Sequence, residues 1–209
     1  MNRNALKLYA VTDRSWLGKE TLLQQVEKAL RGGASFVQMR EKNLDRATFL
    51  QEAVEIGSLC RAYGVPFVIN DDVELALESG ADGVHVGQED MAVSEARRIL
   101  GPDKIIGATS KTVEQALLAE KQGADYLGSG AMFHSTAKPG AEGISFETLR
   151  EICSAVKIPV VAIGGISQDN VTLLQGTGIA GVAVVSAIFA QRDIEAATKK
   201  LYQTVTQIL

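Results

Sequence analysis

GGASFVQMREK, residues 32–42, combines a glycine pair that can end a helix, an apolar run and a highly polar end. The apolar run is typical of a buried strand, and Gln38 to Lys42 would lie at its carboxyl end. Arg40 and Lys42 are two positions apart, so their side chains would project to the same side of an extended backbone. A guanidinium group beside an ammonium group suits a polyphosphate. The alternative is a solvated strand end, and the ends of the other strands must decide between the two.

The same succession of helix, glycine and apolar run recurs along the chain. Helical patterns end just before an apolar run at Gly33-Ala34-Ser35, Gly80-Ala81-Asp82, Gly123-Ala124-Asp125 and Gly178-Ile179-Ala180. The apolar runs show no clear alternation, as expected for strands covered on both faces, and they predict eight strands at residues 6–12, 35–39, 66–70, 83–86, 104–109, 126–129, 160–163 and 181–185. This recurrence predicts an α/β protein, a single-domain (β/α)8 TIM barrel over residues 1–209. The alternative is a doubly wound open sheet, but no Gly-x-Gly-x-x-Gly motif follows the first predicted strand.

Amphipathic segments between these runs predict the helices. An apolar stripe from Leu22 to Leu30 marks one helix, and a capping box formed by Thr112 and Gln115 opens another. The remaining predicted helices cover residues 45–63, 73–79, 94–100, 145–156, 170–176 and 194–209.

The composition is ordinary for a globular protein, with 46% hydrophobic and 22% charged residues. A formal net charge of −4 argues against nucleic-acid binding, which usually requires a basic surface. Cys60 and Cys153 belong to no Cys-x-x-Cys motif and are expected to be buried free thiols in a reducing compartment. No signal-peptide core follows Met1, and the longest nearly apolar run, residues 179–190, is too short to span a bilayer. These features predict a cytoplasmic protein that binds neither nucleic acid nor membrane, and they leave homo-oligomer formation open.

Polar residues follow nearly every predicted strand. In a barrel the carboxyl ends of all strands share one face, which carries the active site. Asp71 and Asp90 follow the third and fourth strands, and two carboxylates from neighbouring strands could bind Mg²⁺ while water and ligand phosphate fill its other positions. The alternative is that each aspartate caps the helix after it. The helix-to-strand turns are mostly Gly, Ala and Pro, and this asymmetry favours a site at the polar end.

Gly164-Gly165 and Val185-Ser186 follow the seventh and eighth strands, where barrels often bind a phosphate monoester. Glycine lets backbone N–H groups approach phosphate oxygens closely, whereas a tight turn with positive φ is the alternative. Lys138 lies in a 15-residue loop, residues 129–143, which is typical of a binding loop, and a solvated lysine is the alternative. His85, within the fourth strand, is expected to be a hydrogen-bonded core residue. A metal pair, a basic cluster and a phosphate cradle, without a nucleophile, predict two phosphorylated small-molecule substrates, one of them a diphosphate.

Six motifs make the chain resemble the thiamine phosphate synthase family over nearly its whole length. They are Tyr9-Ala10-Val11-Thr12-Asp13, Gln38-Met39-Arg40-Glu41-Lys42, Ile69-Asn70-Asp71-Asp72, the run from Gly83 to Asp90, Gly123-Ala124-Asp125-Tyr126 and Ile163-Gly164-Gly165-Ile166. The resemblance implies a transferase that joins a hydroxymethylpyrimidine diphosphate to a carboxylated thiazole phosphate. Thiamine phosphate, diphosphate and carbon dioxide would be released in a dissociative displacement at the pyrimidine methylene.

The resemblance also implies roles for individual residues. Mg²⁺ would be held by Asp71 and Asp90. The pyrimidine diphosphate would be bound by Gln38, Met39, Arg40, Glu41, Lys42, Asn70, Thr109 and Lys138, of which Arg40, Lys42, Thr109 and Lys138 would be catalytic. The thiazole phosphate would be bound by Ser135, Thr136, Ala137, Gly165, Val185 and Ser186.

Two motifs depart from the family pattern. The sixth loop reads Ser135-Thr136-Ala137-Lys138 where the family commonly has Thr-x-Thr-Lys, so one hydroxyl group is missing. The fifth strand ends in Ala108-Thr109-Ser110-Lys111, where a serine followed two residues later by histidine is more usual. Two other functions fit the same fold: a thiazole tautomerase, which would not need both Asp71 and Asp90, and a non-catalytic barrel that binds thiamine phosphates.

Overall fold

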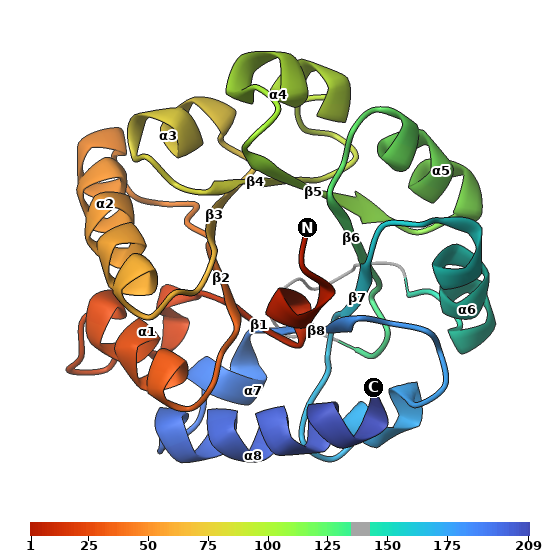
Figure 1. Ribbon diagram of the computed structural model, residues 1–209. Helices are drawn as coiled ribbons and strands as arrows, with labels where there is room; N and C mark the ends of the chain where they lie inside the picture. Colours follow the sequence, from red (N-terminus) through yellow and green to blue (C-terminus); the bar gives the residue numbers. More distant parts are fainter. Residues whose placement is uncertain (135–142) are drawn as a thin grey trace.

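The protein, described by a computed structural model over residues 1–134 and 143–209, is a closed barrel of eight parallel strands. Each strand pairs with its neighbours in the sequence, and β8 pairs with β1 (Figure 1). The strands are β1 (Leu8–Val11), β2 (Phe36–Met39), β3 (Phe67–Asn70), β4 (Gly83–Val86), β5 (Ile105–Ser110), β6 (Tyr126–Ser129), β7 (Val160–Ile163) and β8 (Gly181–Val184). The predicted (β/α)8 barrel is therefore confirmed.

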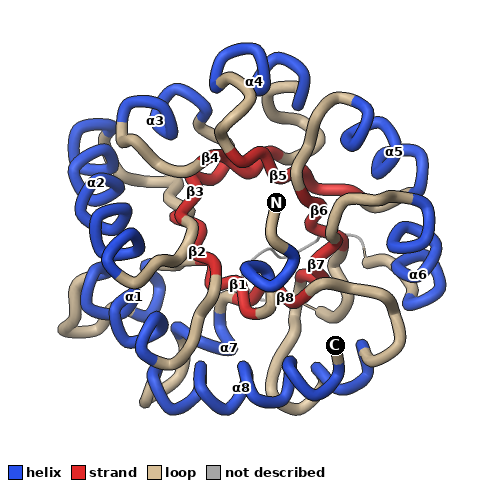
Figure 2. The backbone as a smooth tube through the Cα atoms, viewed as in Figure 1, coloured by secondary structure: helices blue, strands red, loops and turns tan. Residues whose placement is uncertain are grey.

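Helices form an outer ring around the strands, as Figure 2 shows. They are α1 (Leu22–Arg31), α2 (Arg46–Ala62), α3 (Val73–Glu78), α4 (Val93–Leu100), α5 (Val113–Lys121), α6 (Phe146–Ala155), α7 (Ser186–Phe189) and α8 (Ile194–Ile208). Short 3₁₀ turns η1 (Arg3–Leu6), η2 (Arg14–Trp16) and η3 (Val171–Leu174) complete the set. The α-helix predicted over residues 170–176 is wrong: the chain makes only η3, because Gly176 follows it in the left-handed region at φ 75°.

The capping box predicted at Thr112 is half present. The Thr112 hydroxyl accepts a hydrogen bond from the Gln115 N–H at 3.2 Å, but the Gln115 side chain accepts from the Lys111 N–H instead of closing the box. A complete box stands at the start of α1, between Thr21 and Gln24.

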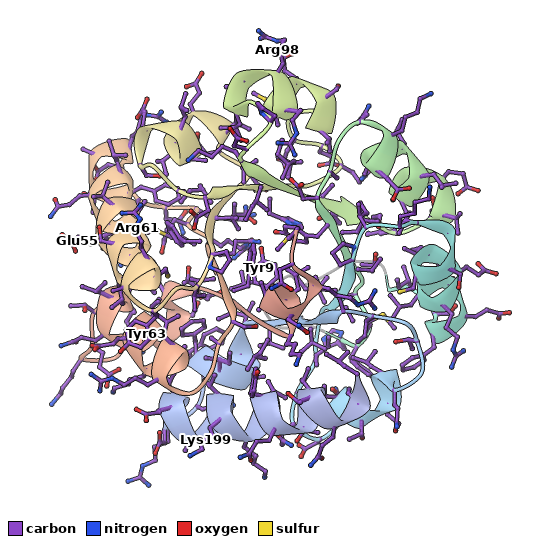
Figure 3. The ribbon with its side chains drawn as sticks, viewed as in Figure 1. Tyr9, Glu55, Arg61, Tyr63, Arg98 and Lys199 are labelled. Carbon is purple, nitrogen blue, oxygen red and sulfur yellow. The ribbon has the colours of Figure 1, made fainter. Side chains whose placement is uncertain are left out.

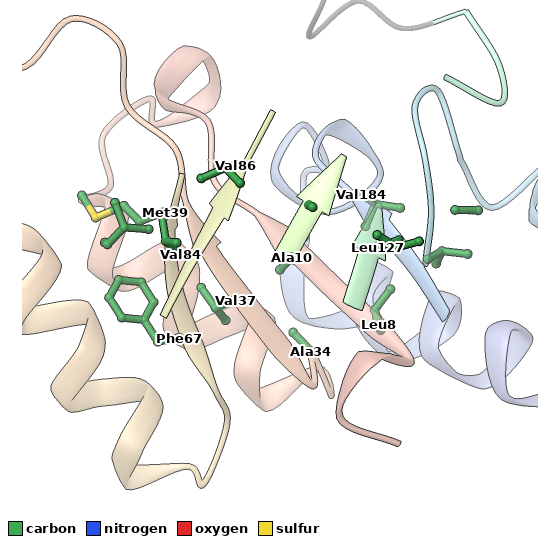
Figure 4. Close-up of a cluster of buried hydrophobic side chains, with 14 of the residues drawn as sticks. Leu8, Ala10, Ala34, Val37, Met39, Phe67, Val84, Val86, Leu127 and Val184 are labelled. Atoms are coloured by element: carbon green, nitrogen blue, oxygen red, sulfur yellow. The ribbon is translucent and has the colours of Figure 1, made fainter. Parts of the chain in front are cut away.

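Two separate apolar layers hold the fold together. The larger one lies between strands and helices and contains Val37, Met39 and Val84 (Figure 4). The smaller one fills the barrel interior with Leu6, Tyr9, Val11, Phe36, Val68, Tyr126, Val161, Ala180 and Ala183. Side chains alternate between these two buried layers along each strand, which explains why the strand sequences read as continuous apolar runs.

The end of the barrel at which the strands begin is closed by packing. The 3₁₀ turn η1 lies across this end in Figure 1, and Leu6 within it is fully buried. Gly181 permits the contact, because a Cβ atom there would lie 1.9 Å from the Leu6 carbonyl oxygen. The polar strand ends lie at the opposite end of the barrel.

Cys60 is buried and Cys153 is partly buried, and both are free, as predicted. Burial raises the pKa of both thiols, to about 12 for Cys60 and about 11 for Cys153. Within residues 1–134 and 143–209, no helix has the length and apolar character needed to cross a membrane.

Candidate active site

The run from Gln38 to Lys42 divides its side chains between two sides of the sheet. Gln38 faces the barrel interior, where its amide nitrogen donates to the Tyr9 hydroxyl. Met39 is fully buried in the layer between strands and helices (Figure 4). β2 ends at Met39, and Glu41, two residues further on, pairs with Arg14. Of the five predicted contacts, the side chains of Met39 and Glu41 are thus directed away from the barrel mouth.

Glu41 instead anchors the end of β2 to its surroundings. Its carboxylate forms an ion pair with Arg14, with Oε1 lying 2.9 Å from Nε. Arg14 also pairs with Glu52 on α2, so one guanidinium lies between two carboxylates. Burial raises the pKa of Glu41 above its ordinary value, and Arg14 opposes that rise. The role of Arg14 could not be predicted from the sequence, in which its only signal is its place just after β1.

Arg40 is held from its backbone. Its N–H donates to the Thr12 hydroxyl at 3.0 Å, and its guanidinium lies 4.0 Å from Asp13 at the end of β1. The ends of β1 and β2 are therefore joined by two pairs of opposite charge, Asp13 with Arg40 and Arg14 with Glu41. This leaves Lys42 exposed, with no ion pair among the described residues.

Lys42, Asn70, Asp71 and Asp90 come together beside the ends of β3 and β4. Asp71 and Asp90 follow the paired strands β3 and β4, and Asp90, Asn70 and Lys42 all lie near enough to the Asp71 carboxyl to influence its pKa. Burial, followed by the proximity of Asp90, raises the pKa of Asp71 to about 6, while Asn70 and Lys42 act in the opposite direction. Two converging carboxylates of this kind repel each other unless a proton or a cation lies between them.

The structure rejects the helix-capping alternative for both aspartates. Asp72, the next residue, caps α3 through the Leu75 N–H at 2.8 Å. Asp71 adopts a left-handed conformation with φ 64°, and its N–H donates to the His85 carbonyl oxygen. Asp90 accepts from the Gly87 N–H at 2.7 Å, whereas α4 begins at Val93, and Ala92 before it provides no side-chain cap. Neither carboxylate is therefore committed to capping a helix.

This pair fits a divalent cation that takes oxygen ligands. Mg²⁺ is commonly held by one or two carboxylates together with substrate phosphate, and two acidic groups here face each other next to Lys42. In the described part of the chain, no group of three or more His, Cys, Asp or Glu side chains is placed to hold a metal ion.

A polar network crosses the barrel interior beneath the mouth. Tyr9 and Tyr126 join through their hydroxyls at 2.7 Å, and the Tyr126 hydroxyl lies 3.0 Å from His85 Nδ1. The other ring nitrogen of His85 lies 3.1 Å from the Thr109 hydroxyl. Figure 3 places Tyr9 inside the ring of strands. Burial lowers the pKa of His85 to about 4 and raises the pKa of Tyr9, so both are neutral near pH 7.

His85 is therefore the hydrogen-bonded core residue that the sequence predicts. The network also joins Gln38 to Thr109, two predicted ligand contacts from β2 and β5. Sequence analysis missed Tyr9 and Tyr126 as members of this site, because an apolar strand that contains tyrosine reads as core.

The glycines after β7 are required by local packing. Gly164 and Gly165 have positive φ values of 97° and 63°. A Cβ atom at Gly164 would lie 2.6 Å from the Cα of Ala131, and one at Gly165 would lie 2.3 Å from the His134 carbonyl oxygen. The tight-turn alternative is thus confirmed, and phosphate binding by this turn stays a prediction.

The remaining predicted contacts belong to two segments. Val185 and Ser186 stand at the start of α7, at the same end of the barrel as the other strand ends. Ser135, Thr136, Ala137 and Lys138 lie outside the described residues.

Comparison with known proteins identifies the family to which this chain is similar. Residues 8–188 match the family model described as thiamine monophosphate synthase. The chain is 48% identical to "Thiamine-phosphate synthase 2" of Streptococcus pneumoniae serotype 4 over 209 residues, the full length of both proteins. It is also 46% identical over 196 residues to the thiamine-phosphate synthase of Ruminiclostridium cellulolyticum, and the match covers 94% of this chain and 93% of that one. Among solved structures, thiamine phosphate pyrophosphorylase from Pyrococcus furiosus superposes with a TM-score of 0.90 at 42% identity, over 99% of this chain and 98% of its own.

Proposed function

The chain belongs to the thiamine monophosphate synthase family. On this basis we propose that residues at the mouth of its barrel bind a pyrimidine diphosphate and a thiazole phosphate and join them. Its activity is that of a thiamine-phosphate synthase, a transferase. One observation carries the proposal for the site: Lys42, Asn70, Asp71 and Asp90 converge at the ends of neighbouring strands. This cluster combines positive charge, an amide and two facing carboxylates at the place where a diphosphate would lie.

The leaving group sets the main demand on the protein. Diphosphate departs from a methylene attached to an electron-rich aminopyrimidine, which leaves a stabilised cation for the thiazole nitrogen to attack. Arg40 and Lys42 would neutralise the negative charge that builds on the departing diphosphate, and Lys138 would add to it from the sixth loop. Positioning and electrostatics would then supply most of the rate.

Asp71 and Asp90 would hold Mg²⁺. When bound, the ion would supply further positive charge to the leaving diphosphate. The protein's own contribution is to keep the two carboxylates together: the Gly87 N–H fixes Asp90, and the left-handed backbone of Asp71 turns that carboxylate toward its partner.

The thiazole phosphate would lie on the opposite side of the mouth. Gly165, Val185 and Ser186 provide backbone groups there, and the start of α7 adds partial positive charge. Ser135, Thr136 and Ala137 would complete this subsite from the sixth loop. A cytoplasmic location and assembly into a homo-oligomer remain predictions from sequence.

The test is release of diphosphate from the two substrates in the presence of Mg²⁺. Asp90→Asn and Lys42→Met should each lower kcat/KM at least about tenfold, the loss expected from one charge-assisted contact to the leaving group. Lys19→Met and Asp103→Asn, at exposed residues outside the cluster, serve as matched controls and should keep full activity.

Three other outcomes would overturn the assignment. Turnover that survives a chelator would remove the metal from the proposal. Binding of both substrates without diphosphate release would favour a non-catalytic thiamine-phosphate-binding barrel. Isomerisation of the thiazole without condensation would favour a tautomerase.

A further inference from the structure

A continuous chain of hydrogen bonds crosses the barrel interior from β2 to β5. It runs from the Gln38 amide to the Tyr9 hydroxyl, then to the Tyr126 hydroxyl, to His85 and to the Thr109 hydroxyl. Its first four members are buried, with exposed fractions of 8% or less, and Thr109 is partly exposed at the carboxyl end of β5. Buried polar groups of this kind need a partner for each donor, so the direction of every bond can be worked out.

The Gln38 amide nitrogen fixes the first step, because it can only donate. Tyr9 therefore accepts from Gln38, and its own O–H has the Tyr126 oxygen, at 2.7 Å, as acceptor. Tyr126 must then donate to Nδ1 of His85. An imidazole that accepts at Nδ1 carries its proton on Nε2, and that N–H donates to Thr109.

The reverse direction leaves a donor without a partner. If Nδ1 carried the proton, Tyr126 would accept from it and would donate to Tyr9. Tyr9 would then accept from both Gln38 and Tyr126, and its own O–H would have no acceptor among the described residues. A doubly protonated imidazole fails for the same reason. An unsatisfied buried donor is strongly disfavoured, so the Nε2–H tautomer is selected by the network.

The space around the imidazole is fitted to it. A Cβ atom at Gly107 would lie 2.5 Å from His85 Nδ1, and one at Gly128 would lie 3.1 Å from Cε1. The two strands that follow β4, β5 and β6, thus carry glycine where any other residue would press on the ring. The ring is confined between Tyr126 and Thr109, with each nitrogen committed to one of them.

We propose that His85, oriented by Tyr9 and Tyr126, is a positioning residue. It directs the Thr109 hydroxyl to donate a hydrogen bond to an acceptor atom of the bound pyrimidine diphosphate. Thr109 receives a hydrogen bond from His85, so its own O–H is free to point into the mouth. The ligand half of this proposal rests on the proposed function, whereas the tautomer of His85 can be tested without it. In this proposal Tyr126 and His85 act on the ligand only through Thr109.

The tautomer is read by long-range ¹⁵N–¹H NMR of the full-length protein near pH 7.5. The chain has only two histidines, and His134→Gln assigns the signals by removing one. For His85 we expect a pyrrole-type shift at Nε2 and a pyridine-type shift at Nδ1. The opposite pattern would mean that Gln38 presents its oxygen to Tyr9 and that the chain runs from Thr109 to Gln38, which would overturn the proposal.

The consequence for the ligand is tested by a double-mutant cycle between Tyr126→Phe and Thr109→Val. Loss of one hydrogen bond should raise the KM for the pyrimidine diphosphate about threefold to tenfold in either single variant. The double variant should be no worse than Thr109→Val alone, because Tyr126 acts through that hydroxyl. Thr109→Ser, which keeps the hydroxyl, should restore the KM of the original protein.

Two readouts separate positioning from general damage. The KM for the thiazole phosphate should not change in any of these variants, and Tyr126→Phe should leave His85 as a mixture of tautomers in the NMR spectrum. Additive losses in the double variant, or equal rises in both KM values, would overturn the proposal. Absence of condensation in the unmodified protein would refute the proposed function while the tautomer experiment still stands.

Discussion

Replacing His85 with glutamine should make the protein lose less stability, by the His85 contribution, when the pH falls from 7.5 to 5. Burial lowers the pKa of His85 from 6.5 to about 4, and the nearby charge of Asp90 opposes that change only in part. The folded protein therefore resists a proton that the unfolded chain accepts. A group with a lowered folded-state pKa contributes stability above pH 6.5 and loses it as the pH falls toward 4.

The size of the effect follows from the two pKa values. Linkage predicts that the free energy of unfolding falls by about 1.4 kcal/mol per pH unit between the two pKa values, and by about 2 kcal/mol in total between pH 7.5 and pH 5. Urea unfolding at several pH values, followed by the fluorescence of Trp16, the chain's single tryptophan, measures it. We expect the free energy of unfolding to fall by that amount in the unmodified protein relative to His85→Gln.

The matched control is His134→Gln, which removes the other, exposed histidine and should leave the pH dependence unchanged. Asp71 contributes in the opposite direction over part of this range, but it is present in all three proteins and cancels in the comparison. Parallel pH profiles for the unmodified protein and His85→Gln would refute the reasoning. They would mean that His85 takes up its proton in the folded state as readily as in water, which a buried hydrogen-bonded imidazole should not do.

Three further changes have definite expected outcomes. Asp71→Asn should raise the free energy of unfolding, measured at pH 7.5 without Mg²⁺, by about 1 kcal/mol after solvent screening. The reason is that a carboxyl group whose pKa is raised to about 6 destabilises the fold once the pH rises past that value. An unchanged urea midpoint would contradict this. Gly107→Ala would place a methyl group 2.1 Å from a tyrosine ring carbon and should cost at least about 1–3 kcal/mol in the same assay, whereas a neutral result would mean that the interior repacks freely. Arg14→Met should lower the free energy of unfolding by about 1–3 kcal/mol, because it leaves Glu41 and Glu52 unpaired. Adding Glu41→Gln to this variant should recover part of the loss. No recovery would show that the two carboxylates do not repel each other.

The barrel and the face that carries its site could be predicted because both depend on local pattern. Helix-ending glycines before apolar runs mark the repeat, and polar residues after those runs mark the carboxyl ends of strands. The pairing of Asp71 with Asp90 followed from neighbouring strands alone. The helix predicted over residues 170–176 failed because a left-handed glycine outweighed an apolar stripe too short to extend an α-helix.

The interior network could not be predicted in the same way. Tyr9 and Tyr126 are separated by 117 positions, and their contact depends on the closure of β1 onto β8 and on the angle between strands across the barrel. A tyrosine in an apolar strand gives no sign of which layer it faces when both layers are buried. Only the register of the closed sheet decides that Tyr9, Tyr126 and His85 share one interior.

The same two-residue period explains how one short run can serve both ligand and fold. Arg40 and Lys42 need positions at the mouth, and the intervening residue must then face the helices, where a charge is unfavourable unless it is paired. Arg14 supplies that pair and is itself held by Glu52 on α2. The Glu41–Arg14 pair therefore fixes the chain just past the end of β2, between Arg40 and Lys42. The charges that made residues 38–42 conspicuous thus have two different causes: Glu41 is held in an ion pair with Arg14, whereas Arg40 and Lys42 stay predicted contacts of a diphosphate.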